Sequence, residues 1–258
     1  MWKDLAGSRE LAWQLTVRDY KGQYRQSVLG VLWAFIMPVM NTLVWIFLNM
    51  TQVVKIPETG VPYLAYVFAG TMLWSVLVES INMPLMQTQA AKSIMGKINF
   101  PKEALLLSGF YKVLSNSLIK LALVLVIVLA VGIRPHPQML FIPVGILALV
   151  VCGFSAGILV TPVGMLYNDV GRGIPLLMQF LMYLSPVVYF TPQLGSLAAV
   201  VAYNPLTPLI VNARNAFTGM PFENLPYFFI LTGGMCLLGL AGWMVYRFSI
   251  PIIVERAG

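Results

Sequence analysis

Apolar residues dominate six segments of the chain, and polar or basic residues separate them. The six segments cover roughly 30–52, 62–83, 104–132, 140–166, 174–191 and 226–248. A helix needs about 20 mainly apolar residues to cross the hydrocarbon core of a bilayer. The pattern therefore predicts six transmembrane helices, of which the third and fourth are long enough to tilt or to protrude.

The composition agrees with a membrane protein. Of the 258 residues, 59% are hydrophobic and 10% are charged, and the mean hydropathy is +0.83. Soluble domains carry about 25% charged residues, and so few polar groups could not cover the surface of a soluble fold of this length. We therefore expect an all-α membrane protein.

The basic residues set the expected orientation. With the N-terminus inside, most of the 16 Lys and Arg residues fall on the cytoplasmic side: Lys3, Arg9, Arg18, Lys21, Arg25, Lys92, Lys97, Lys102, Lys112, Arg172, Arg247 and Arg256. Lys55, Arg134 and Arg214 fall outside, and Lys120 lies within a span. By the positive-inside rule, this predicts a multi-pass protein of the cytoplasmic (inner) membrane with both termini in the cytoplasm. The rule also accounts for the net charge of +7, so no nucleic-acid partner is expected.

The segment between the fifth and sixth spans is ambiguous. Residues 194–211 are apolar enough for a seventh span, but Asn204, Pro205 and Pro208 interrupt them. Non-helical backbone at membrane depth survives only when it is buried in protein or lines a cavity. We therefore predict two short re-entrant helices over about 193–218 that dip back from the outer face, with a seventh span as the alternative.

The N-terminal region before the first span has its own periodicity. Apolar and aromatic residues recur every three or four positions at Trp13, Val17, Tyr20, Tyr24 and Val28. Basic residues form a neighbouring stripe at Arg18, Lys21 and Arg25. Such a helix suits the membrane interface, with rings at headgroup level. Residues 1–29 are therefore predicted to form an interfacial helix region ahead of a membrane domain over 30–258, either as a simple anchor or with a functional role.

A polar, basic segment, MQTQAAKSIMGKINFPKE, joins the second and third spans on the cytoplasmic side. Helical character begins at Gln87, and Pro101 stops the element before the next span. A short helix here would transmit movement to both spans. An ordinary basic loop is the alternative reading.

Few side chains within the spans carry chemistry. Glu79 and Lys120 are the ionisable pair, and they form either a structural salt bridge or part of a proton relay. Pro186 predicts a kink in the fifth span, and Tyr183, Tyr189 and Phe190 near it are either interfacial aromatics or the lining of a sugar pathway. No phosphate-binding loop is present, since Lys97 follows Gly96 without the upstream glycine. No catalytic motif or metal-ligand cluster occurs in the sequence, so we expect no enzyme.

Several of these segments, taken in order, resemble type-2 ABC exporter permeases, and within them the Wzm-like group that exports lipid-linked O antigens, capsules and teichoic acids. The matching stretches are RDYKGQYRQSVLGVLW over 18–33 followed by Pro38, NFPKE over 99–103, YLSPVVY over 183–189, and NPLTP over 204–208 leading to Ala213 and Arg214. One departure is Tyr167-Asn168-Asp169, where the family often has an Arg-Asp pair.

The resemblance implies a homodimer that exports lipid-linked polysaccharide with two copies of a cytoplasmic ABC ATPase. ATP and Mg would bind to the ATPase, with no cofactor in this chain. The coupling helix, over about 87–100, would contact the ATPase through Gln87, Gln89, Lys92, Ser93, Lys97, Asn99 and Phe100. The interfacial helix would use Trp13, Arg18, Tyr20, Lys21, Tyr24 and Arg25. The channel would be lined by Trp33, Tyr183, Ser185, Tyr189 and Phe190, and the outer gate would be formed by Asn204, Pro205, Pro208 and Arg214.

Three alternatives to polysaccharide export remain at this point. One is a type-2 permease for another substrate, such as a lipid, drug or teichoic acid. Another is a carrier driven by protons or sodium ions, although such a carrier would need several carboxylates in its spans and the sequence offers Glu79 alone. The last is a structural or assembly protein of the membrane.

Overall fold

The computed structural model describes residues 2–24, 33–51, 61–97, 100–189 and 198–257, and within these ranges it contains helices and no strand. The helices are α1 (Trp2–Tyr24), α2 (Trp33–Met50), α3 (Tyr63–Ala90), α4 (Lys92–Met95), α5 (Glu103–Ala130), the 3-10 helix η2 (Pro137–Phe141), α6 (Ile142–Leu166), α7 (Asn168–Leu184), α8 (Ala198–Tyr203), α9 (Leu206–Thr218) and α10 (Leu225–Ala257). The predicted all-α class is confirmed.

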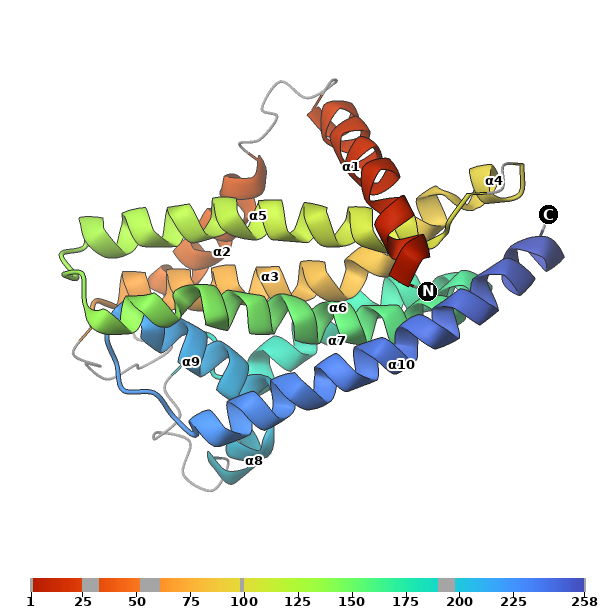
Figure 1. Ribbon diagram of the computed structural model, residues 1–258. Coiled ribbons are helices and arrows are strands. Elements are labelled where there is room, and N and C mark those ends of the chain that lie inside the picture. The colour runs from red at the N-terminus through yellow and green to blue at the C-terminus, as the bar shows by residue number, and fades with distance from the viewer. Residues whose placement is uncertain (1, 25–32, 52–60, 98–99, 190–197, 258) are drawn as a thin grey trace.

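Four of the predicted spans are helices long and apolar enough to cross a membrane: α3, α5, η2 with α6, and α10. The other two are shorter. The described part of α2 has 18 residues, and α7 has 17. Figure 1 shows the four long helices side by side, with α6 between α10 and the pair formed by α3 and α5.

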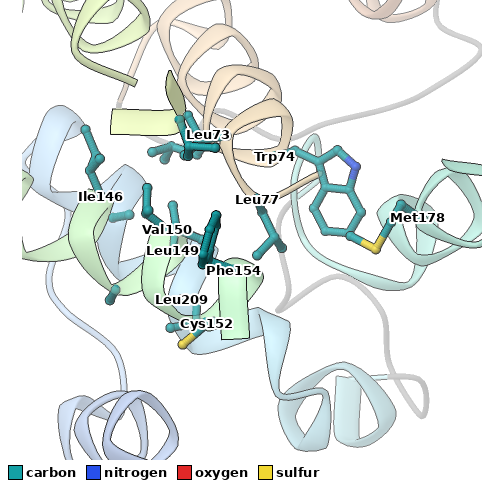
Figure 2. Packing of buried hydrophobic residues seen from close by; sticks show 14 of the residues in the cluster. Leu73, Trp74, Leu77, Ile146, Leu149, Val150, Cys152, Phe154, Met178 and Leu209 are labelled. Carbon is teal, nitrogen blue, oxygen red and sulfur yellow. The ribbon is translucent and has the colours of Figure 1, made fainter. Parts of the chain in front are cut away.

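The core is built around α3 and α6. Gly153 and Gly157 of α6 face α3 so closely that a Cβ atom on Gly157 would lie 2.3 Å from the carbonyl oxygen of Ile81. The small residues of α6 thereby let the two helices pack closely. Figure 2 shows Leu73 and Leu77 of α3 beside Val150 and Leu149 of α6. Because lipid is as apolar as these side chains, close packing rather than release of water stabilises this contact.

The fifth predicted span lies earlier in the chain than 174–191. Only Tyr167 separates α6 from α7, so the segment expected to be a turn forms the first turns of α7 instead. The helix ends at Leu184, and Ser185 has an extended backbone with φ −114 and ψ 142. Pro186 explains this end, because proline disfavours the helical conformation in the residue before it. Pro186 therefore terminates the helix rather than kinking it.

The two short helices expected between the last spans are α8 and α9. Asn204 and Pro205 separate them, and every residue of α9 from Thr207 to Thr218 is buried. A helix of 13 residues is about 20 Å long, which is too short to cross a hydrocarbon core of about 30 Å. The helix lengths therefore argue against a seventh span, and the re-entrant position of α8 and α9 in the bilayer stays a prediction.

Candidate functional site

The predicted coupling segment is the end of α3 followed by one short helix. Instead of a single helix over about 87–100, α3 continues to Ala90, the chain turns at Ala91, and α4 covers Lys92–Met95. The side chains of Lys92, Ser93 and Lys97 are exposed. Phe100 packs against the core, and Asn99 lies outside the described residues.

Two glutamines of this segment face the bundle. Gln87 is buried beside Gly109 of α5. The side-chain amide of Gln89 donates to the carbonyl oxygen of Gly164 at 3.2 Å. These contacts attach the end of α3 to α5 and α6, and they leave α4 as the exposed part of the segment.

The interfacial helix α1 packs across α5 through polar and aromatic contacts. The ring of Trp13 meets the ring of Tyr111 edge-on at 6.4 Å between centroids. The hydroxyl groups of Thr16 and Ser108 lie 3.1 Å apart, and Figure 1 shows the crossing of the two helices. Trp13 of the predicted membrane-facing stripe therefore contacts protein, although it remains 60% exposed.

A chain of side-chain contacts continues from α1 into the membrane helices. The hydroxyl of Tyr20 donates to Asn116 Oδ1 at 2.7 Å, and Asn116 donates through Nδ2 to Glu79 Oε1. The other oxygen of Glu79 lies 2.8 Å from the ammonium group of Lys120. The Glu79–Lys120 salt bridge is thereby confirmed. We call the contacts from Tyr20 to Lys120 the inner polar chain, after the cytoplasmic side on which the sequence predicts them; they join α1, α5 and α3.

A second ionic contact lies beside this chain. Lys112 of α5 approaches Asp19 Oδ2 at 2.9 Å, and Arg18 approaches Asp19 Oδ1 at 2.8 Å. Burial raises the pKa of the Asp19 carboxyl group, but hydrogen bonds from Lys112 and Arg18 outweigh burial and hold this pKa below its usual value. Lys21 is exposed. Arg25 lies outside the described residues, and only the backbone of Tyr24 is described.

Two cavities flank the inner end of α3. A cavity of about 640 Å³ lies between α1, α3 and α5, and the inner polar chain forms part of its wall. A smaller one, of about 340 Å³, lies between α3 and the start of α7, where Asn82, Gln89, Asn168 and Arg172 line it. Met86 borders both cavities and is 60% exposed.

The outer end of α7 is held by side chains from three other elements. After α7 ends, the backbone of residues 185–189 is not helical. Its carbonyl oxygens accept hydrogen bonds from the hydroxyl of Tyr66 at 2.9 Å and from Arg214 Nη1 at 2.6 Å. Asn204 donates to the carbonyl oxygen of Leu184 at 3.0 Å. These contacts give donors to backbone oxygens that no helix pairs, and we call them the outer clamp, after the side on which the sequence predicts this end of α7.

Arg214 is the centre of the outer clamp. Its side chain is 2% exposed, and the guanidinium carbon lies 3.8 Å above the ring of Tyr66. Gly70 lets the clamped segment approach, because a Cβ atom there would lie 2.1 Å from the carbonyl oxygen of Val187. Arg214, which the sequence places on the outer side and in the outer gate, is therefore buried in protein, where carbonyl oxygens and an aromatic ring surround its guanidinium group.

The predicted channel residues divide into exposed and buried positions. Tyr183 is 56% exposed and packs against Trp45 of α2, with 6.2 Å between ring centroids. Ser185 is fully buried and accepts a hydrogen bond from Asn204, so it does not line an open path. Tyr189 is partly buried. Phe190 lies outside the described residues, and only the backbone of Trp33 is described.

The predicted gate residues lie at the junction of α8 and α9. Asn204 accepts a hydrogen bond from the backbone of Leu206 at 2.9 Å, which begins α9. Pro205 follows as the residue before the helix, and Pro208 lies in its first turn, where proline is tolerated. The structure thus brings Asn204 and Arg214 together on the outer clamp.

Comparison with known proteins identifies the family. Residues 10–218 match the family described as ABC-2 type transporter, which is more than half of the chain. The chain belongs to the ABC-2 type transporter family. The match runs from α1 to α9, so it includes the exposed α4, the inner polar chain and the outer clamp of this transporter chain.

Several curated relatives of this ABC-2 transporter chain cover nearly its whole length. A Klebsiella pneumoniae protein named O-antigen export system permease protein RfbA is 24% identical over 242 residues, 91% of this chain and 92% of its own. A second Klebsiella pneumoniae protein of that name is 23% identical over 236 residues, 90% of this chain and 89% of its own. A Myxococcus xanthus protein of that name is 24% identical over 218 residues, 83% of both chains.

Sequence reasoning did not single out Asp19, Asn116 or Ser108 of this transporter chain. The sequence analysis assigned Lys112 only to the basic residues of the cytoplasmic side. A signal was present, because Asp19 lies between two basic residues of α1, and Asn116 lies one helical turn from both Lys112 and Lys120. Their partners are far away along the chain, however. Asp19 and Lys112 are 93 residues apart, Tyr20 and Asn116 are 96 apart, and Asn116 and Glu79 are 37 apart.

Proposed function

We propose that this chain is the membrane subunit of an ATP-driven exporter of lipid-linked, O-antigen-like polysaccharide across the cytoplasmic membrane. The observation that carries the proposal is the similarity to O-antigen export permeases over about nine-tenths of the chain, together with the family match. ATP and Mg bind to a separate cytoplasmic ATPase, of which two copies act on a homodimer of this chain.

The exposed helix α4 supports the coupling role. It presents Lys92, Ser93 and Lys97, while Gln87 and Gln89 attach it to the rest of the bundle. Because α3 is a continuous helix from Tyr63 to Ala90, a displacement at α4 moves the whole span. An ATPase that binds α4 differently with and without ATP would shift the balance between closed and open states.

The apolar faces of α2 and α7 support a dimer around a shared path. Large apolar side chains are exposed on both helices, including Val44 and Phe47 on α2 and Leu177 and Phe180 on α7. Exposed apolar faces of this kind suit contact with a second copy as well as with lipid. We propose that α2 and α7 meet the same helices of a second copy, with Tyr183 exposed to the sugar chain.

The inner polar chain bears on the ion-coupled alternative. Glu79 is the carboxylate that the sequence predicts within a span, and Lys120 and Asn116 occupy both of its oxygens. A carboxylate with both oxygens bonded to side chains of another helix fits a structural salt bridge better than a relay, which needs further ionisable groups along a path. Export driven by a separate ATPase is therefore the better reading, and a type-2 permease for another lipid or drug is the second candidate.

The experiment reverses the charge of α4. The variant Lys92→Glu with Lys97→Glu is reconstituted with the proposed partner ATPase, and both ATP hydrolysis and glycan export are measured. We expect the dimer to assemble and export to fall at least about tenfold, which corresponds to 1.4 kcal/mol of lost coupling. Arg134→Glu at the opposite end of α5 is the matched control and should leave export unchanged.

Normal export by the double variant would remove α4 from the coupling mechanism. Export of cargo by the purified chain in the absence of any nucleotide hydrolase would contradict the proposal as a whole.

A further inference from the structure

The smaller cavity at the inner end of α3 has a single charged residue in its wall, and that residue is a cation. Arg172 of α7 lines the cavity, and none of the described carboxylates does so. Among the described side chains, Arg172 forms no ion pair. Asp169, three residues earlier, is exposed and lies outside the lining. The larger cavity differs, because two cations and two carboxylates share its wall. The smaller cavity alone of these two therefore carries an unbalanced positive charge.

Amide side chains make up the rest of the polar wall. Asn82 and Gln89 line the cavity from α3, and Asn168 lines it from α7. A side-chain amide nitrogen carries two N–H donors. Asn82 and Gln89 each use one donor on a backbone carbonyl oxygen, which leaves the second for a ligand. A guanidinium group with further N–H donors around it suits a phosphate group, because an arginine and a phosphate can share two parallel hydrogen bonds.

The size and position of the cavity suit a head group. Its volume of about 340 Å³ is at the lower end of the range for small-molecule sites. Arg172 and Met86 in its wall are both exposed, so a ligand can reach it from the surface. The sequence predicts Arg172 on the cytoplasmic side, which is the side from which an exported lipid-linked molecule enters.

A stripe of polar and aromatic side chains leads from the cavity along α7. Arg172, Gln179 and Tyr183 are separated by seven and four residues, so they lie within about 40° of one another around the helix axis. All three are exposed, whereas Leu176 and Phe180 beside them are exposed and apolar. Arg172 and Tyr183 are about 17 Å apart along the axis. A sugar chain that begins at the cavity would therefore reach Tyr183, the residue assigned above to the sugar path.

We propose that this cavity binds the phosphate group through which the exported glycan is attached to its lipid, with Arg172 as the cationic partner and the three amide side chains as further donors. The inference rests on the proposed function and adds the chemistry of the linkage, a phosphate ester between the lipid and the first sugar. The sugar chain follows the stripe from Arg172 past Gln179 to Tyr183.

The test measures equilibrium binding to the purified full-length protein in detergent. Two probes carry the same disaccharide, attached to a prenyl chain either through a diphosphate or through a glycosidic bond without phosphate. We expect the wild type to bind the diphosphate probe at least about tenfold more tightly, since hydrogen bonds between charged groups contribute about that much. Arg172→Gln should remove this preference, and Arg172→Lys should keep part of it. Arg134→Gln, an exposed cation beyond the other end of α5, is the control and should keep all of it.

Two neighbouring positions provide the second arm. Asn168→Asp places a carboxylate in the wall of the cavity and should weaken binding of the diphosphate probe about tenfold, without changing the affinity for the phosphate-free probe. Asp169→Asn, which changes a residue outside the lining, should weaken neither. Both positions are exposed, so both variants should fold.

Several results would overturn the proposal. Equal affinity of the wild type for the two probes is one, and a preference for diphosphate that survives in Arg172→Gln is another. Displacement of the diphosphate probe by an equal concentration of inorganic phosphate or phosphatidylglycerol would show that the cavity does not recognise the substrate. Loss of the ATPase on purification of Arg172→Gln would assign the cavity to the contact between the subunits.

Glycan export separates this inference from the proposed function. If the wild type exports glycan with the ATPase and Arg172→Gln binds and exports equally well, the phosphate site is wrong and the proposed function stands. If the wild type with the ATPase exports no glycan, the proposed function itself is contradicted.

Discussion

The inner polar chain and the outer clamp solve the same problem in different ways. Each brings polar groups together within a largely apolar bundle. In the inner chain, side chains bond to side chains of other helices, as Glu79 does with Lys120. In the outer clamp, Tyr66 and Arg214 bond to the backbone oxygens of a segment that has left the helical conformation.

The difference teaches which junction can rearrange. Asp19 and Lys112 beside the inner chain are partly exposed, so water can replace either partner when α1 moves against α5. Opening the outer clamp should cost more free energy than separating Asp19 from Lys112, because the backbone oxygens of the clamp would lose their hydrogen-bond donors. We therefore expect movement between α1, α3 and α5 at the inner end and a fixed arrangement at the end of α7.

The largest expected effect comes from breaking the inner salt bridge on one side only. Glu79→Leu leaves Lys120 charged and nearly buried, and it should lower the free energy of unfolding by about 3–5 kcal/mol. Adding Lys120→Met removes the stranded charge and should recover most of this loss. Unfolding in detergent measures both variants. A double variant that remains as unstable as Glu79→Leu would show that the cost comes from something other than the unpaired ammonium group.

A somewhat smaller loss should follow from removing the centre of the outer clamp. Arg214→Met abolishes the contact with the ring of Tyr66 and leaves the carbonyl oxygen of Pro186 without a donor, at a cost of about 2–3 kcal/mol. Hydrogen exchange should increase at residues 185–189 and not along α1. Arg134→Met, at an exposed position, is the control and should change neither quantity. Faster exchange in α1 as well would mean that the two junctions are not independent.

The smallest effect, and the one that depends on pH, concerns Asp19. Because its partners hold the pKa below the ordinary value of 3.8, the carboxylate stabilises the folded protein above that value and loses its effect as the pH falls through the lower, folded pKa. Asp19→Asn should therefore cost about 1 kcal/mol at pH 7 and progressively less in acid.

Unfolding of the wild type, of Asp19→Asn and of the exposed control Asp169→Asn between pH 3 and pH 7 checks the Asp19 prediction. A constant difference between Asp19→Asn and wild type at every pH would be inconsistent with a role for the charge.

Much of the helical layout was predictable from the sequence. The apolar stretches identified the four long spans, and the pairing of α8 with α9 followed from Asn204 and Pro205. The end of α7 was placed several residues too late, because the hydropathy of Val187, Val188 and Tyr189 continues past Pro186 although the helix does not. Proline can kink a helix or end it; the sequence analysis predicted a kink at Pro186, and in the structure the helix ends before it.

The site residues were less predictable than the helices. The sequence predicted an ATPase contact for Gln87 and a channel-lining role for Ser185, and both roles require exposure. In the structure both residues are buried. Arg214 was counted with the charges of the outer side, and the sequence did not indicate that it lies over the ring of Tyr66. No pattern within one helix reveals these placements, since each depends on a partner from a different helix.

The sequence by itself determined that this chain is a helical membrane protein and where most of its helices lie, because hydropathy and proline act over a few neighbouring residues. The tertiary structure alone decided which polar groups meet. The salt bridge between Asp19 and Lys112, and the hydrogen bond from Tyr66 to the carbonyl oxygen of Tyr189, form only when helices far apart in the chain pack together. In a medium with little water, each polar group must find such a partner, and the packing of the helices determines which one it finds.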